Sequence, residues 1–332
     1  LGAHALPRDA QLGSWQRELL VNEKSLCLSL HALAAQLRSD AHVMAVSGLG
    51  GLFGRGDAPA EAGLSLQGGS SGLIKSVREE RPALRTRAID LDPALAAAEQ
   101  LAIISAELQL VGGRQEVGYP GGQRMLFRTQ AHEIASSDLL PPLNNAVVLA
   151  TGGARGITAE VLRDLARPGN VLILTGRSEL HEEDPATAGL DSPNALRQYF
   201  IGEVRAGRLQ LSPAEVQRKV AAIVALREMH SNIADLRQAG ATVEYIAVDV
   251  THEPAVQALM AGLRERYGKV SGVVHGAGVI EDKLLEDKTA ESWMRVVGTK
   301  VNGMLLLQKY VDVAELDFFA VFSSVAGRYG NS

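Results

Sequence analysis

A glycine-rich turn is the first segment whose residue types predict chemistry. The residues TGGARGI follow the apolar run AVVLA and open a predicted helix. Glycines at such a turn let the backbone approach a pyrophosphate closely, and the helix N-terminus offers free N–H groups with partial positive charge. The alternative interpretation is an ordinary strand-to-helix turn. The candidate coenzyme-binding residues of this segment are Thr151, Gly152, Gly153, Arg155, Gly156 and Ile157.

Three further segments stand at the ends of the apolar runs that follow. A cation at the first of them, Arg177, would pair with the 2′-phosphate of NADPH, whereas an acid there would favour NAD. Taken singly, these segments also have ordinary interpretations as a solvated arginine, a helix cap and a turn. Four such signals in order predict one coenzyme site, because the ends of parallel strands meet at one edge. The added candidates are Arg177, Ser178, Asp249, Val250, His275, Gly276, Ala277 and Gly278.

A regular alternation of elements is needed to hold these segments together. From residue 146 onward, apolar strand-like runs alternate with helical patterns, which predicts a doubly wound parallel sheet. A polar stretch at 179–194 precedes a long helical pattern at 213–238. We interpret that polar stretch as an insertion or a surface loop.

The first half of the chain also alternates, but less regularly. One long helix is expected over 17–38, and strand-like and helical runs lead from it to a hairpin signal at Pro120, Gly121 and Gly122. The glycines within 48–54 are not followed by a good helix start, so we do not interpret them as a phosphate loop. The sequence therefore predicts two Rossmann-like α/β units, 1–140 and 141–332, of which the first is truncated.

Composition limits the classes of partner. The 332 residues include 33 Lys and Arg against 38 Asp and Glu, a net charge of −5. No global basic field would recruit nucleic acid or an anionic membrane, and no apolar run approaches the roughly 20 residues that span a bilayer. The single cysteine, Cys27, excludes an intrachain disulfide and a cysteine-based zinc cluster. We expect no metal site and a reducing, cytoplasmic setting.

Several longer segments resemble one known family. TGGARGI resembles the turn of short-chain dehydrogenases/reductases. VVHGAGVIEDKLLEDKTAESWMRVVGTKVNG and FFAVFSSVAGRYGN resemble ketoreductase domains of type I polyketide and polyunsaturated-fatty-acid synthases. GGSSGLIKSVREERPALRTRAIDLDP and RQEVGYPGGQRM resemble the structural subdomain that precedes the catalytic one. The resemblance covers nearly the whole chain, and implies a bracing first unit without a coenzyme site and a second unit that binds NADPH.

The resemblance also implies a role for single residues. Asp249 would face the adenine amino group, and His275 to Gly278 would pass beneath the coenzyme. Ser324 would bind the substrate carbonyl, and Lys300 would support a tyrosine acid. Taken alone, Ser324 could be a capping serine and Lys300 a solvated lysine.

The tyrosine that this family places after the serine falls beyond Ser332, since Tyr329 is too close to Ser324 to match it. The missing tyrosine therefore predicts a C-terminally incomplete fragment, and the start without Met suggests that the other end is cut as well. Such a fragment should bind coenzyme but reduce very little by itself.

The implied activity is NADPH-dependent reduction of a carrier-bound 3-ketoacyl thioester to the 3-hydroxyacyl thioester. The implied partners are an acyl carrier protein bearing a 3-ketoacyl phosphopantetheine and the neighbouring domains of a synthase. Two alternatives stay open. One is a non-catalytic structural or carrier-docking fragment, and the other is a short-chain dehydrogenase acting on a small alcohol or ketone.

Overall fold

The chain folds into two compact units. The computed structural model describes residues 6–7, 10–56, 66–113, 115–135 and 142–331. Unit 1 comprises Leu1–Leu139, Val279–Lys309 and Ser323–Ser332, and unit 2 comprises Leu140–Gly278 and Tyr310–Phe322. A break near residue 140 was expected, although the expected boundary itself lies outside the described residues. The grouping of 279–309 and 323–332 with the first unit differs from the continuous division that the sequence predicts.

The packing of one short segment explains part of this difference. Leu285 is buried in the same apolar cluster as Cys27 and Leu30, and Trp293 packs against that cluster. The backbone N–H of Leu285 also donates to the Glu80 carboxylate at 2.7 Å. Contacts between residues so distant in sequence leave no periodic signal, so the sequence pattern did not reveal them.

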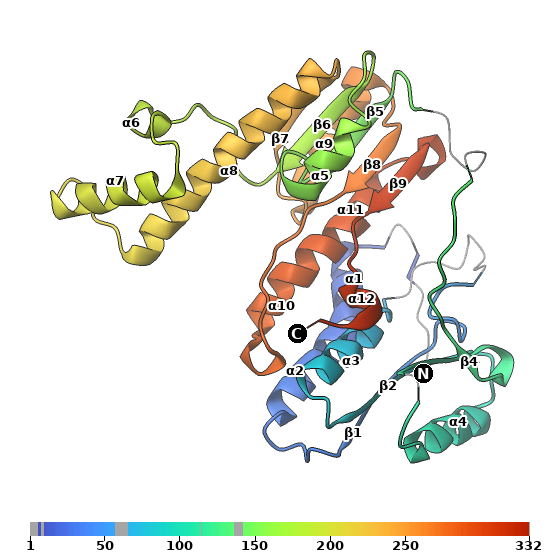
Figure 1. Ribbon diagram of the computed structural model, residues 1–332. Helices are drawn as coiled ribbons and strands as arrows, with labels where there is room; N and C mark the ends of the chain where they lie inside the picture. The colour runs from blue at the N-terminus through green and yellow to red at the C-terminus, as the bar shows by residue number, and fades with distance from the viewer. Residues whose placement is uncertain (1–5, 8–9, 57–65, 114, 136–141, 332) are drawn as a thin grey trace. The chain divides into compact units, whose positions relative to one another are not determined.

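Unit 2 is built on a parallel five-stranded sheet (Figure 1). Its strand order is β7-β6-β5-β8-β9, which confirms the predicted doubly wound sheet. The chain runs outward from β5 to β7 and then returns to β8 beside β5, so the topology reverses between β5 and β8. The elements are β5 (Val147–Thr151), α5 (Gly156–Arg163), β6 (Val171–Gly176), β7 (Thr242–Ala247), α9 (Glu253–Tyr267), β8 (Gly272–His275), η6 (Val313–Glu315) and β9 (Phe318–Val321).

The central strands form because their residues are apolar on both faces. Leu149, Leu172, Ile173 and Leu174 are fully buried. Such continuous apolar runs are typical of parallel strands covered by helices on both sides. Leu172 and Leu174 share an apolar cluster with Leu162 of α5, and this packing fixes the helix against the sheet.

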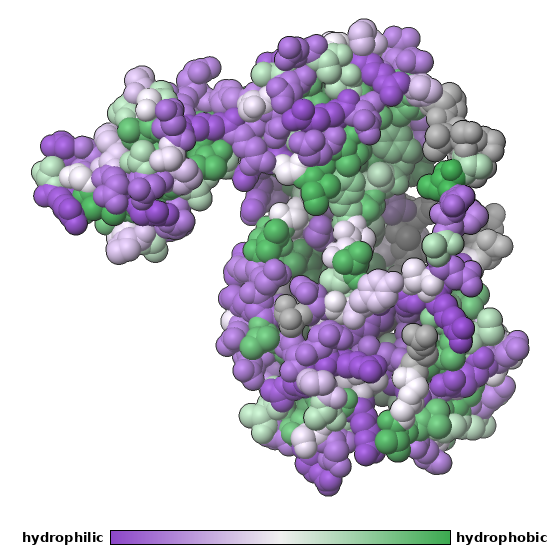
Figure 2. Space-filling view, viewed as in Figure 1, coloured by the Kyte–Doolittle hydropathy of each residue, from purple (hydrophilic) through white to green (hydrophobic). Residues whose placement is uncertain are grey.

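An inserted arm extends from unit 2. It contains α6 (Pro185–Ala188), α7 (Pro193–Arg205) and α8 (Pro213–Gln238), and Figure 1 shows α8 reaching beyond the sheet with α6 and α7 near its far end. Its surface mixes hydrophilic residues with a few hydrophobic ones (Figure 2). Leu196 and Phe200 of α7 pack against α8 in a small core of their own.

The sequence predicted only part of this arm. The bounds of α8 agree with the predicted helix at 213–238, and its N-terminus carries a capping box made by Ser212 and Glu215. The sequence did not predict α7. Its N-terminus, capped by Ser192 with Pro193 following, falls at the end of the polar stretch interpreted as a loop.

Unit 1 contains a smaller sheet of order β1-β2-β3-β4. The first three strands are parallel, and β4 pairs antiparallel with β3 across the turn η2 (Pro120–Gly122), as the hairpin signal predicted. The other elements of this sheet are β1 (His42–Ser47), α3 (Gly69–Glu80), β2 (Arg85–Leu91), α4 (Ala97–Gln109), β3 (Glu116–Tyr119) and β4 (Met125–Leu126).

Two long helices contain π-helical turns. The first runs through α1 (Leu12–Leu19), η1 (Leu20–Lys24) and α2 (Ser25–Leu33), so it begins and ends earlier than the helix expected over 17–38. The second runs through α10 (Ala290–Val297), η5 (Gly298–Asn302) and α11 (Gly303–Tyr310). Such turns often accompany functional positions, and η5 contains the candidate Lys300. Unit 1 also contains two short segments, η4 (Leu285–Asp287) and α12 (Ala326–Tyr329).

None of the helices in the described part of the chain combines the length and apolar character that a bilayer crossing requires. Within the same ranges, no group of three or more His, Cys, Asp or Glu side chains is arranged to hold a metal ion.

Candidate coenzyme site

The four strand-end segments of unit 2 meet at one edge of its sheet. Thr151 lies opposite Thr175 on one side and His275 on the other. Gly176 lies opposite Ala247, so the turn after β7 reaches the same edge. The structure therefore brings together the segments at 151–157, 175–178, 249–250 and 275–278, beside the topological reversal where α/β sheets bind ligands.

Gly152 occupies a position that only glycine fits well. Its φ is +68°, and its N–H donates to the Thr175 carbonyl at 2.7 Å. A Cβ added at Gly152 would lie 3.1 Å from backbone atoms of Gly276 and Ala277. The turn thus packs directly against the segment after β8. Without a side chain at Gly152, a ligand can approach the protein backbone closely at this edge of the sheet.

Gly276 explains a departure from the usual glycine pattern. Thr158 stands where a third glycine is common in this kind of motif, and its side chain is buried. A Cβ at Gly276 would overlap the Thr158 hydroxyl. The missing side chain at Gly276 therefore makes room for the larger Thr158 side chain, and α5 still packs closely on the sheet.

Thr151 and His275 position the edge through their side chains. The Thr151 Oγ1 lies 2.7 Å from His275 Nδ1, and it accepts the Ala277 N–H at 3.2 Å. Both side chains are buried. These two residues therefore tie β5 to β8 and to the turn that follows.

The N-terminus of α5 already holds an anion. The N–H of Gly156 donates to the Glu228 carboxylate at 2.9 Å, and Arg155 Nε donates to the same carboxylate at 2.9 Å. Partial burial raises the pKa of Glu228, but the bonds from Gly156 and Arg155 outweigh it and hold that pKa below its usual value. The site therefore accommodates negative charge, as a phosphate-binding turn must.

Glu228 and Asn232 are functional candidates that sequence reasoning missed. Both lie on α8, and Asn232 donates to the Ala154 carbonyl at 3.0 Å. Asp235, one further turn along, pairs with Arg163 of α5 at 2.9 Å. The spacing of Glu228, Asn232 and Asp235 was the available signal. These three polar residues lie along one side of α8, next to an apolar side, and this pattern indicates a polar contact with a neighbouring element.

Arg177 follows β6 and is exposed, as a residue that binds a phosphate from solution must be. Asp249 accepts the Thr251 N–H at 2.9 Å and its hydroxyl at 2.7 Å. Burial raises the pKa of Asp249, yet these bonds and the nearby Arg177 cation keep that pKa lower than usual. Asp249 thus organises its own turn at the sheet edge.

The other two candidates of these segments have contacts within unit 2. The Ser178 carbonyl accepts the Tyr245 hydroxyl at 2.6 Å, and Val250 is buried.

Ser324 and Lys300 belong to unit 1, whereas the coenzyme-loop residues belong to unit 2. The Ser324 hydroxyl accepts the Ala326 N–H at 3.1 Å, a local turn that precedes α12, whose N-cap is Val325. Lys300 is half-buried within the π-helical turn η5. The catalytic roles of Ser324 and Lys300 therefore stay predictions.

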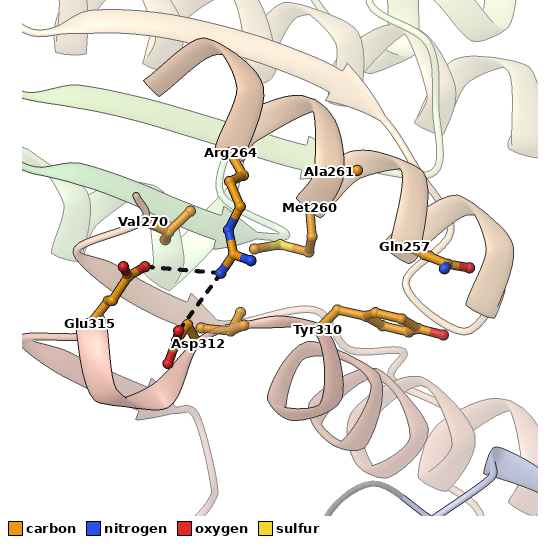
Figure 3. A pocket seen from close by; sticks show the side chains of 9 residues that line it. Gln257, Met260, Ala261, Arg264, Val270, Tyr310, Asp312 and Glu315 are labelled. Atoms are coloured by element: carbon orange, nitrogen blue, oxygen red, sulfur yellow. Dashed lines mark ion pairs between the residues drawn. The ribbon is translucent and has the colours of Figure 1, made fainter. Parts of the chain in front are cut away.

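A small cavity of about 180 Å³ in unit 2 lies away from these loops. Val270 lines it just before β8 begins, so it opens at the amino ends of the strands. Arg264 reaches between Asp312 and Glu315 there, 3.9 Å from each (Figure 3). None of the predicted site residues lines this cavity.

Comparison with known protein families gives a match to the part of the chain that contains these segments. Residues 146–332 match the model of the KR domain, a stretch that spans more than half of the chain. The chain belongs to the KR, or ketoreductase, domain family. The glycine-rich turn, the other strand-end segments, Lys300 and Ser324 all fall within the matched residues.

Relatives of this KR domain are large synthases. It is 34% identical over 194 residues to a polyunsaturated fatty acid synthase protein of Thraustochytrium, covering 56% of this chain and 7% of that protein. It is 29% identical over 221 residues to the polyketide synthase PksN of Bacillus subtilis, covering 66% of this chain and 3% of that protein. The chain therefore spans only a small part of these relatives.

Solved ketoreductase structures share the fold across both units of this KR domain. An N-terminal ketoreductase from the macrolactin assembly line matches with a TM-score of 0.68 and 22% identity, covering 100% of this chain and 56% of that one. An A-type ketoreductase from a modular polyketide synthase matches with a TM-score of 0.64 and 26% identity, covering 92% and 55%. At 22% identity the first match shows the fold alone.

Proposed function

We propose that unit 2 binds NADPH and that the chain serves the reduction of a carrier-bound 3-ketoacyl thioester to the 3-hydroxyacyl thioester. The observation that carries this proposal is the single sheet edge formed by the four strand-end segments, with an anion already bound by the N-terminus of α5. The names of the relatives, which are polyketide and fatty acid synthases, support the substrate class.

The residues at this edge fit a dinucleotide. Gly152 lets the chain pass close to Gly276, and Gly153 is similarly confined, with the position of its Cβ 2.9 Å from Ala150. The N–H groups of the first turn of α5, of which that of Gly156 now donates to Glu228, would hold the pyrophosphate. The exposed guanidinium of Arg177 would pair with the 2′-phosphate, and Asp249 would face the adenine. NADPH, when bound, supplies the hydride.

The groups proposed for the substrate lie in unit 1. The Ser324 hydroxyl would donate to the ketone oxygen and stabilise negative charge that develops there. Lys300 would support the group that donates a proton to that oxygen. The proposed partners are an acyl carrier protein that presents the 3-ketoacyl phosphopantetheine and the neighbouring domains of the synthase.

The rest of unit 1 is proposed to brace unit 2 rather than to bind coenzyme. Its own strand-to-helix turns use their N–H groups internally. Asp90, fully buried at the end of β2, accepts the N–H groups of Leu49 and Phe53 at 2.7 and 2.8 Å. Because these donors already have a buried acceptor, the glycines around them offer no phosphate loop, which supports the prediction from sequence.

The test of this proposal is a titration of the chain with NADPH and NADH. We expect NADPH to bind about tenfold or more tightly than NADH, since a charged hydrogen bond contributes roughly 1.5 to 3 kcal/mol. The Arg177→Ala variant should lose most of that preference and leave the affinity for NADH nearly unchanged. Equal affinities for the two coenzymes, with no change in Arg177→Ala, would overturn the assignment of the 2′-phosphate.

A further inference from the structure

The inserted helix α8 is anchored beside the glycine-rich turn. Met229 and Leu236 are buried in the main core of unit 2 together with Leu162 of α5. Asn232, on the neighbouring stripe, holds the Ala154 carbonyl within the turn itself. The residues that follow Glu228 therefore hold the α8 backbone in place and keep Glu228 opposite the first turn of α5.

The Glu228 carboxylate holds the donors that an anionic ligand would need. It accepts one bond from the Gly156 N–H and one from Arg155 Nε, each at 2.9 Å. Its side chain is 37% exposed and that of Arg155 is 51% exposed, so both can be reached from solution. A phosphate that approached this turn would meet a carboxylate already bound to the same donors and would be repelled by its charge.

We propose that Glu228 lowers the affinity of unit 2 for its coenzyme, because its carboxylate competes with the coenzyme phosphates for Gly156 and Arg155. This inference rests on the coenzyme site proposed above. Glu228 is thus an affinity-determining residue supplied by the insertion. Replacing it should strengthen binding, whereas replacing a residue that merely supports the turn should weaken it.

The test compares three proteins in titrations with NADPH and NADH. Glu228→Gln keeps an oxygen that can accept the Gly156 N–H but removes the charge. Asp235→Asn is the matched control, since it removes an equal charge from the same helix and breaks a similar pair with α5 through Arg163. We expect Glu228→Gln to tighten the binding of both coenzymes about threefold or more, the size of an interaction between partly exposed charges, and Asp235→Asn to leave both unchanged.

A second arm assigns the effect to Arg155. In an Arg155→Ala background, Glu228→Gln should bring a smaller gain, because one of the two contested donors is gone. Thermal unfolding of each variant shows that the fold is retained. Unchanged or weaker binding of NADPH by Glu228→Gln would overturn this inference while leaving the proposed function intact. Failure of both the original chain and Glu228→Gln to bind NADPH would overturn the proposed function, and this inference with it.

Discussion

The two units contain the same arrangement at the start of one helix, but they use it differently. In unit 1, α3 follows β1 and its N-terminal Gly69 donates to the Glu23 carboxylate at 2.9 Å. In unit 2, α5 follows β5 and its Gly156 donates to the Glu228 carboxylate at the same distance. Both helices cross between parallel neighbouring strands. A glycine-rich turn with an acceptor on the helix N-terminus is thus common to both.

Burial separates the two arrangements. Glu23 is only 7% exposed, and burial raises its pKa to about 8 even though the N–H groups of Gly69 and Ser70 act in the opposite direction. Glu228 is 37% exposed, and its pKa is lowered. A buried internal acceptor cannot be exchanged for a ligand, whereas an exposed carboxylate can be. The comparison teaches that solvent access to the acceptor, rather than the glycine motif, distinguishes a binding turn from a structural one.

The largest expected effect concerns the glycines of the two turns. Gly51 in unit 1 has φ +80°, and a Cβ there would overlap the backbone of Tyr119 and Pro120. Gly51→Ala should destabilise unit 1 by about 3 kcal/mol or more, since backbone atoms must shift. Gly156 has φ +56° with no atom within 4 Å of its Cβ position. Gly156→Ala should cost only about 1 kcal/mol, from the left-handed backbone conformation.

Urea unfolding followed by two probes measures this difference. The two tryptophans, Trp15 and Trp293, both belong to unit 1, so their fluorescence follows unit 1, whereas circular dichroism follows the helices of both units. The fluorescence midpoint should fall strongly in Gly51→Ala, and the midpoint measured by circular dichroism should fall only a little in Gly156→Ala, which serves as the matched control. Equal shifts in the two variants would contradict the proposed contrast between the turns.

A smaller expected effect is the pH dependence caused by Glu23. Because its pKa is about 8 in the folded chain and its ordinary value is 4.5, the folded state keeps a proton that the unfolded state loses between these values. Stability of unit 1 should therefore fall as pH rises from about 4.5 to 8, by about 5 kcal/mol at most. Glu23→Gln should remove this part of the decline, since the amide does not titrate.

Unfolding midpoints at several pH values, again followed by tryptophan fluorescence, check this expectation. Glu228→Gln is the control, because the lowered pKa of Glu228 gives it no titration in that window. If the midpoints of Glu23→Gln vary with pH as those of the original chain do, Glu23 is already ionised in the folded chain. The contrast between a protonated Glu23 and an ionised Glu228 would then be wrong.

Sequence reasoning succeeded where local pattern decides structure. The apolar runs that became β5 and β6 are buried on both faces, so their composition alone predicted parallel strands. Their order along the chain then predicted that the turns after them share one edge, and the sheet of unit 2 confirms it.

The features that sequence reasoning missed depend on contacts across the fold. Glu228 was missed because the polar stripe of α8 indicates a contact with a neighbouring element but does not show that this element is the first turn of α5. The assignment of 279–309 to unit 1 follows from the packing of Leu285 beside Cys27, which no local pattern encodes. The π-helical turn that places Glu23 opposite α3 likewise has no periodic signature.

Hydrogen–deuterium exchange of the chain with and without NADPH tests the central claim, that α5 and not α3 binds the coenzyme. The account predicts slower exchange on NADPH addition at residues 152–157 and 276–278 of unit 2. It predicts no change at Leu49, Phe53, Gly69 and Ser70, whose amides already have buried acceptors in unit 1. Protection at these unit 1 amides, or NADPH binding without protection at the α5 turn, would contradict it.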